Sequence, residues 1–415
     1  MTSPPATSRR VRALSLLVLA VGAVAFVVMA WLLIPWHPYP GGRLRLPPAD
    51  SIYSPAEIAR ASAYSHDLRW LSRGALVVSV VTACLLGFTR VGRWITGRLP
   101  GPWPVRTVLA VLAVVVIGRL VVLPFDIAVQ HQERRYGLSD QPWGGWLRDL
   151  GVGAGISVVA TSLAVLALLA CTRRWRASWP LVAGGTLAVL VVLGSFVYPV
   201  LVEPLFNNFH SLPDGPLRTQ VMALADQEGV HVDDVLVADA SRRTTTLNAY
   251  VTGFGGTRRV VLYDTLLDAT SRRQTLAVVS HELAHAKHDD VLVGTALGAA
   301  GALVAVGLLG LLVGRRHGGL TDPAVVPLLL ALFALGSALA TPVENVLSRQ
   351  VETRADVDGL RTTRDLTAFV QLQRTLDARS LTDPTPPALS QWWFGSHPTS
   401  LQRIAIGERV LRQSR

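Results

Sequence analysis

The chain has 415 residues, enough for two or three domains, but 50% of them are hydrophobic and the mean hydropathy is +0.39. This composition is too apolar for an average soluble protein and favours an integral membrane protein. Much of the net charge of +11 comes from arginine clusters beside apolar runs, such as Arg9, Arg10 and Arg12. Such clusters are typical of membrane edges, so we expect membrane lipid as a partner and no nucleic acid.

Seven apolar runs have roughly the length of a membrane-spanning helix, which needs about 20 residues. They cover residues 13–34, 74–89, 107–125, 151–171, 181–202, 291–313 and 324–341. The first lacks a small-residue cleavage site, so we interpret it as a membrane anchor and not as a signal peptide. The fold class predicted is a mainly α-helical membrane protein with about seven transmembrane helices.

Two polar stretches flank the last pair of apolar runs and are predicted to form one split domain. The expected organisation is a five-helix membrane region (1–202), a first part of the polar domain (203–290), a transmembrane hairpin (291–342) and a second part (343–415). In the first part, residues 217–228 are predicted to form an amphipathic helix that ends at Gly229. Three segments rich in β-branched residues predict a small sheet: 235–238, 247–252 and 259–263. Glycines between the last two indicate a hairpin.

The segment 275–288 (TLAVVSHELAHAKH) predicts a helix that carries a metal site. His281 and His285 are four residues apart, so they share one face of the helix and can bind the same ion. Glu282 lies beside them, where its carboxylate can take a proton from a zinc-bound water and return it to the leaving amine. The alternative is a pair of solvated histidines, a pattern that rarely arises by chance with only 10 histidines in the chain.

A hydrolytic zinc site requires a third protein ligand and one open position. Glu352 is the candidate, because it follows the seventh apolar run and returns to the membrane face of His281. Asp356, one turn further on, can accept the N–H of a ligand histidine and fix its tautomer. Arg349, Glu352 and Asp356 could equally form ordinary ion pairs on a surface helix, and the residues alone do not decide between these two interpretations.

Several further segments, taken with the zinc helix, resemble one known family. They are residues 53–60 (YSPAEIAR), 133–141 (ERRYGLSDQ), 204–209 (PLFNNF), 241–250 (SRRTTTLNAY), and His397-Pro398 with Arg403. In this order and spacing the chain resembles the integral-membrane zinc endopeptidases of the CAAX prenyl protease type 1 (a-factor-converting) family, which are related to the HtpX-type membrane proteases.

The resemblance implies a gluzincin-type domain with one Zn²⁺ per chain on His281, His285 and Glu352. It implies Glu282 as the catalytic base and Asp356 as the residue that orients a ligand. The strand with Asn248 and Ala249 is expected to bind an extended peptide along its edge, although Asn248 is also typical of an ordinary strand end. His397 and Arg403 resemble tail residues that the family brings to the cleft, where a histidine can stabilise an oxyanion and an arginine can hold a carboxylate or a substrate carbonyl. Without the resemblance they would be a helix cap and a solvated arginine.

The expected activity is a zinc metalloendopeptidase that cleaves membrane-associated or lipidated proteins. The chain prefers arginine strongly over lysine, which suggests a GC-rich genome and hence a bacterial cell membrane. In a bacterium, the alternative function is that of an HtpX-like quality-control protease. An inactive scaffold is disfavoured by the intact motif, and a transporter by the lack of ionisable pairs within the spans. Sidedness stays open, because arginine-rich short loops place the zinc domain outside the cytoplasm, whereas the resemblance implies a cytosolic site.

Overall fold

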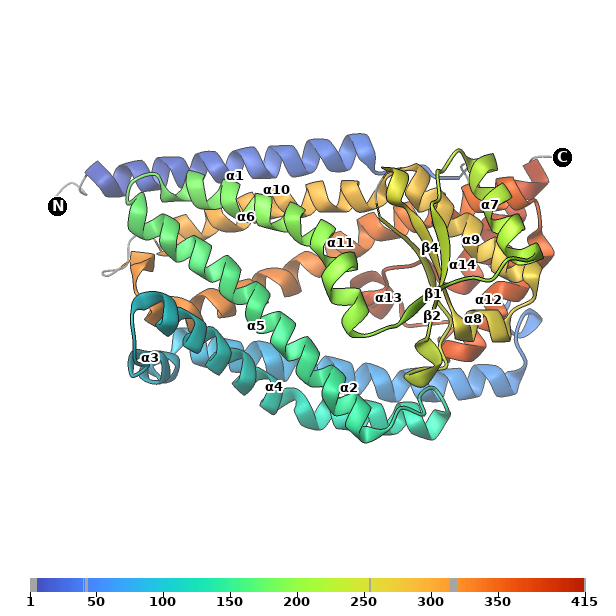
Figure 1. Ribbon diagram of the computed structural model, residues 1–415, viewed down its shortest axis with the longest axis horizontal. Helices are drawn as coiled ribbons and strands as arrows, with labels where there is room; N and C mark the ends of the chain where they lie inside the picture. The colour runs from blue at the N-terminus through green and yellow to red at the C-terminus, as the bar shows by residue number, and fades with distance from the viewer. Residues whose placement is uncertain (1–5, 40, 42–43, 254, 314–318, 414–415) are drawn as a thin grey trace.

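The computed structural model describes residues 6–39, 41, 44–253, 255–313 and 319–413. Long helices run along the long axis of the molecule, and a small α/β domain lies at one end of it (Figure 1). The helices are α1 (Ala6–Leu33), α2 (Pro55–Phe88), α3 (Arg90–Gly97), α4 (Trp103–Tyr136), α5 (Trp143–Arg174), α6 (Trp179–Val197), α7 (Pro216–Glu228), α8 (Asp264–Ala269), α9 (Arg272–Lys287), α10 (Asp290–Val313), α11 (Val326–Thr363), α12 (Leu366–Ser380), α13 (Ala388–Phe394) and α14 (Ser400–Gln413). The strands are β1 (Phe209–Ser211), β2 (Asp234–Ala238), β3 (Ala249–Thr252) and β4 (Arg259–Tyr263).

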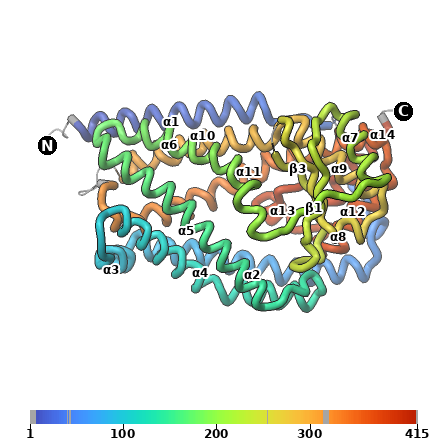
Figure 2. Tube along the Cα trace, viewed as in Figure 1, coloured from blue at the N-terminus to red at the C-terminus, as the bar shows by residue number. Residues whose placement is uncertain are grey.

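Among the described residues, seven helices are long and apolar enough to cross a membrane, as predicted. Large apolar side chains on them face outward: Trp31 is 75% exposed and Phe333 70%. Because such exposure is unfavourable in water, these surfaces are suited to lipid. Some glycines lie at contacts between these helices instead. A Cβ added at Gly307 of α10 would lie 2.6 Å from the Leu19 nitrogen of α1, so the glycine allows the close contact of these two helices, which run side by side in Figures 1 and 2.

Three of the spanning helices are much longer than the apolar runs that identified them. Helix α2 begins at Pro55 behind a capping box formed by Ser54 and Glu57, and α4 continues to Tyr136. Helix α11 passes through Pro342 without ending and extends to Thr363. Hydropathy detects only the apolar part of a helix, so the predicted runs stop short of the polar ends of these helices.

The sheet has the order β1-β2-β4-β3, with β2 and β4 parallel and the other two pairs antiparallel. Strand β3 is therefore an edge strand. Strand β1 was not predicted, because three residues are too few to show an alternating pattern. The buried residues of β2, β4, α7 and α9 form one core, including Val221, Val235, Leu262, Val279 and Leu283.

The predicted glycine hairpin is present between β3 and β4. Gly253 has a φ of +88°, and a Cβ at this position would lie 2.3 Å from the Thr257 carbonyl oxygen. Only glycine fits a position that has both a left-handed backbone and so close a neighbour. The turn sets the register in which Ala249 lies opposite Leu262.

Candidate metal centre

Helix α9 holds both histidines of the motif in place. It starts at a capping box, in which the Ser271 side chain accepts from the Gln274 N–H and the Gln274 side chain accepts from the Ser271 N–H. Val279 and Leu283 are fully buried in the core against the sheet. His281 and His285 instead line a cleft. Burial of the apolar face thus fixes the direction in which the two imidazoles point.

Helix α11 packs closely against α9 at Gly359. A Cβ on Gly359 would lie 3.1 Å from the backbone nitrogen of His281, and the Ser280 hydroxyl donates to the Gly359 carbonyl at 3.2 Å. The absence of a side chain allows the two backbones to approach. This contact brings Glu352, two turns earlier on α11, opposite the histidines.

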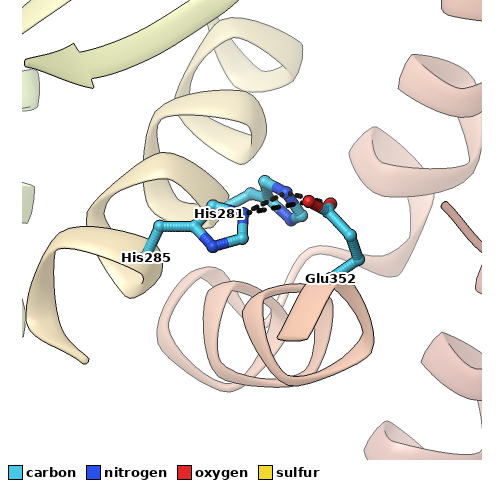
Figure 3. Close-up of side chains that lie close together, drawn as sticks. All are labelled: His281, His285 and Glu352. Atoms are coloured by element: carbon cyan, nitrogen blue, oxygen red, sulfur yellow. Dashed lines mark hydrogen bonds and ion pairs between the residues drawn. The ribbon is translucent and has the colours of Figure 1, made fainter. Parts of the chain in front are cut away.

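His281, His285 and Glu352 come together as shown in Figure 3. The Nε2 atoms of the histidines are 3.1 Å apart. Glu352 Oε2 is 3.3 Å from His281 Nε2, and its Oε1 is 3.7 Å from His285 Nε2. Glu352 Oε2 is buried, and none of these contacts has the geometry of a hydrogen bond to it. One donor atom from each residue lies within 4.8 Å of the others. Two imidazole nitrogens and a carboxylate converging on one point fit a zinc ion with one open position.

Asp356 contacts His281 on the side away from this point. His281 Nδ1 is 2.9 Å from Asp356 Oδ1, but the angle between the groups is outside the range of a hydrogen bond. Arg403 holds the other side of this buried carboxylate with two bonds, from Nε to Oδ2 at 2.7 Å and from Nη2 to Oδ1 at 2.6 Å. Burial lowers the pKa of His281, but the carboxylates of Asp356 and Glu352 outweigh this effect and raise it to about 10. A bound metal ion would have to displace this proton.

Asp290 is a functional candidate that the sequence analysis missed. Its Oδ2 is 2.9 Å from His285 Nδ1, and its Oδ1 accepts from Arg354 of α11. The position depends on a sharp break between α9 and α10, where Asp289 has a φ of 52°. The sequence signal for it is a pair of aspartates, Asp289 and Asp290, directly after the motif.

Glu282 lines the same cleft as the two histidines. Burial raises the pKa of the Glu282 carboxyl, and the neighbouring histidines only partly oppose this. A carboxyl group whose pKa is shifted upward from its ordinary range is suited to accept and release a proton near neutral pH.

The cleft has a volume of ≈ 710 Å³, and its walls come from both parts of the split domain. Asn248, Ala249 and Tyr250 form one wall, and His397 lies close to Glu352, with Nε2 3.1 Å from Oε2. The His397 side chain is 55% exposed. Arg403 is not among the lining residues. Two roles were considered for Arg403: to hold a carboxylate or to hold a substrate carbonyl. The geometry fits the first, because Arg403 binds the carboxylate of Asp356 and does not reach the cleft.

A second feature that the sequence analysis missed is the pairing of Tyr250 with Glu203. The Tyr250 hydroxyl donates to Glu203 Oε2 at 3.2 Å, and both residues line the cleft. Burial raises the pKa of Tyr250, as does the carboxylate of Glu203. Tyr250 therefore stays neutral and connects strand β3 to the chain that leaves the fifth spanning helix.

Seven helices that are long and apolar enough to cross a membrane, with two histidines and two glutamates in one cleft, are the features expected of an integral-membrane metallopeptidase. A model of peptidase family M48 matches residues 211–408, and a model of the CAAX prenyl protease N-terminal region, described as five membrane helices, matches residues 43–208. The chain belongs to this family of CAAX prenyl protease-like membrane metalloproteases. The predicted family, enzyme class and membrane location are confirmed.

Similar proteins occur in bacteria and eukaryotes. An uncharacterised metalloprotease of Bacillus subtilis, YhfN, is 29% identical, over 94% of this chain and 96% of its own. A CAAX prenyl protease 1 homolog of Arabidopsis thaliana is 28% identical, over 68% of each chain. The crystal structure of Ste24p from S. mikatae superposes with a TM-score of 0.74 at 19% identity, over 98% of this chain and 100% of that one, which shows the same fold. The bacterial relative supports a bacterial membrane.

Proposed function

We propose that this protein is a zinc-dependent endopeptidase that cleaves extended segments of membrane-associated or lipidated proteins. The observation that carries the proposal is the convergence of His281, His285 and Glu352 beside Glu282, in a cleft that one edge strand of the sheet lines. The first three residues would hold one Zn²⁺. When bound there, zinc would activate a water molecule and polarise the scissile carbonyl group.

Glu282 is the proton carrier in this proposal. Its carboxylate takes a proton from the attacking water and delivers it to the nitrogen of the leaving amine. Burial among the residues of the cleft holds the pKa of the Glu282 carboxyl above its ordinary range. Asp356 and Asp290 each face the Nδ1 atom of one histidine, so they hold the rings with both Nε2 atoms directed toward the metal position.

The substrate is proposed to add a strand to β3. In an antiparallel pair, successive residues alternate between bonding to the neighbour and pointing away from it. Because Tyr263 donates to the Asn248 carbonyl, the main-chain groups of Asn248 and Tyr250 point toward β4, and those of Ala249 and Val251 point to the free edge. Ala249 thus provides hydrogen bonds to any extended peptide, largely independent of its sequence.

His397 and Arg403 have different roles in this mechanism. His397 lies at the rim of the cleft beside Glu352, where its imidazole N–H can donate to the oxyanion of the tetrahedral intermediate. Arg403 positions Asp356 and so acts through His281. Burial lowers the pKa of Arg403, but Asp356 outweighs burial and raises it, so the guanidinium stays charged.

The main test compares the wild type with Glu282→Gln on a panel of lipidated and unmodified peptides. We expect the variant to retain zinc and to lose activity by a factor on the order of 10²–10⁴, the usual contribution of general acid–base catalysis. Glu344→Gln is the control, because Glu344 is exposed on α11. Equal cleavage by wild type and Glu282→Gln would contradict the mechanism.

The same panel separates the two substrate classes. A CAAX protease-like enzyme should cleave peptides with a prenylated cysteine faster than the unmodified peptides. An HtpX-like quality-control protease should cleave unfolded membrane-protein segments without this preference. A wild type that binds zinc and cleaves nothing would support the inactive scaffold.

A further inference from the structure

A second cavity of ≈ 330 Å³ lies outside the metal centre. Its walls come from three parts of the chain that are far apart in sequence: the segment after α1, the polar half of α11, and the C-terminal tail. The residues that matter here are Trp36, Tyr39, Arg349, Gln350, Pro398 and Gln402. No aspartate or glutamate lines the cavity in the part of the chain that the structure describes.

Arg349 gives this cavity a positive charge without a matching negative one. Its Nη1 atom donates to the main-chain carbonyls of Gln391, at 3.3 Å, and of Gly395. Within the described residues, no carboxylate lies at ion-pair distance from Arg349. Most other partly buried arginines of the split domain (203–290 and 343–415) do have a carboxylate partner. A half-buried charge that only neutral carbonyls solvate is costly, so an anion in the cavity would be favourable.

The cavity lies just beyond the end of a candidate spanning helix, where a membrane edge is expected. Helix α1 ends at Leu33, and its last turn exposes Trp31 and Leu32, which are 75% and 71% exposed. Trp36 and Tyr39 follow within six residues and line the cavity. Tryptophan and tyrosine concentrate at the depth of lipid headgroups, and the exposed side chains of α1 offer a surface for acyl chains. The abundant anions at this depth are the phosphates of phospholipids.

We propose that this cavity binds the phosphate group of an anionic phospholipid, with Arg349 as the cation and Trp36 and Tyr39 beside the headgroup. Arginine is well suited to this ligand because its planar group donates two parallel hydrogen bonds to phosphate. The lipid would sit against α1 with its chains in the bilayer, and its headgroup would reach the helix that carries Glu352.

The cavity is connected to the metal centre through the residues before His397. Arg349 donates to the Gln391 carbonyl, and the Gln391 side chain donates to the His397 carbonyl at 2.6 Å. A bound lipid should therefore hold this segment, and with it His397, in position. This second part of the inference depends on the proposed role of His397 in catalysis, whereas lipid binding does not.

Binding is tested on the purified full-length protein by native mass spectrometry, with short-chain phosphatidylglycerol, short-chain phosphatidylcholine and inorganic phosphate as probes. We expect the wild type to retain phosphatidylglycerol preferentially and Arg349→Gln to bind it about tenfold more weakly or worse, because a charge-assisted contact is lost. Arg135→Gln is the control, since Arg135 is an exposed arginine at the end of α4 and should leave binding unchanged.

Gln350→Glu is a second variant that keeps the bonds of Arg349 to the α13 segment. It places a carboxylate in the cavity and should weaken phosphatidylglycerol binding in a similar way, which covers the case in which Arg349→Gln fails to fold. Equal binding of phosphatidylglycerol by the wild type and Gln350→Glu would overturn the proposal. So would equal retention of phosphatidylcholine, or inorganic phosphate that displaces the lipid at equal concentration, because the site would then select a free anion.

Turnover in nanodiscs gives a separate measurement. Phosphatidylglycerol should raise kcat of the wild type several-fold over phosphatidylcholine, and Gln350→Glu should lose this dependence while it retains zinc. If lipid binds as predicted but kcat is the same in both lipids, the link to His397 is wrong and the lipid site stands. If no wild-type activity is found on any substrate, the proposed function fails and the binding result is unaffected.

Discussion

The histidine half and the acidic half of the candidate metal centre are built in different ways. His281 and His285 share one short helix, and a capping box and a buried face orient both. Glu352 and Asp356 come from the far end of a long helix, and their distance from the histidines is set by a backbone contact at Gly359. The geometry of the histidine half is local, and a five-residue motif is enough to specify it. The second half depends on how two distant segments pack.

Among the changes that test this difference, removal of Glu352 should have the largest effect on zinc binding. Glu352→Ala leaves two ligands, and zinc affinity should fall by at least about 100-fold, beyond the 10–100-fold typical of residues that only support a ligand. Metal content after dialysis against a graded chelator measures this, with Glu344→Ala as the exposed control on the same helix. Unchanged zinc stoichiometry would mean that the third ligand is another residue.

The two aspartates that face the histidines should differ from each other. Asp290→Asn should weaken zinc binding about 10–100-fold, because His285 loses the carboxylate that orients it. Asp356→Asn should do the same to His281 and destabilise the fold by about 3–5 kcal/mol, because Asp356 is fully buried and binds Arg403 with two bonds. The loss of stability in Asp290→Asn should be smaller, because the Asp290–Arg354 pair is more exposed. Zinc titration and thermal unfolding in detergent separate the effects. Equal loss of stability in both variants would remove the distinction between the halves.

A single methyl group at the contact between α9 and α11 should have a smaller effect, but it should still weaken zinc binding. Gly359→Ala places a Cβ 3.1 Å from the His281 nitrogen, and overpacking of this kind costs about 1–3 kcal/mol. Helix α11 must shift, so zinc affinity should fall together with stability. Gly336→Ala on the same helix is the matched control, because a Cβ there meets nothing within 4 Å. If both alanines bind zinc like the wild type, the contact at Gly359 does not set the site.

The parts of the fold and site that the sequence could predict are those with local causes. Seven spans follow from hydropathy, the zinc helix follows from the spacing of His281 and His285, and the hairpin follows from its glycines. Glu352 and Asp356 were named from their place after the last span, and their approach to His281 is a property of the folded chain. Asp290 and the Tyr250–Glu203 pair could not be found, because the first depends on one left-handed residue and the second joins segments 47 residues apart.

The separation of the two halves also affects when the enzyme becomes competent during its synthesis. The ribosome completes α9 and the two histidines before it has made α10 and α11, and Glu352 follows only after both of these helices. His397 is later still, near the end of the tail. A chain that has not threaded its last hairpin into the bilayer therefore carries a motif but no complete ligand set. If these residues are the ligands, as proposed, zinc binding requires successful insertion of the last hairpin into the membrane.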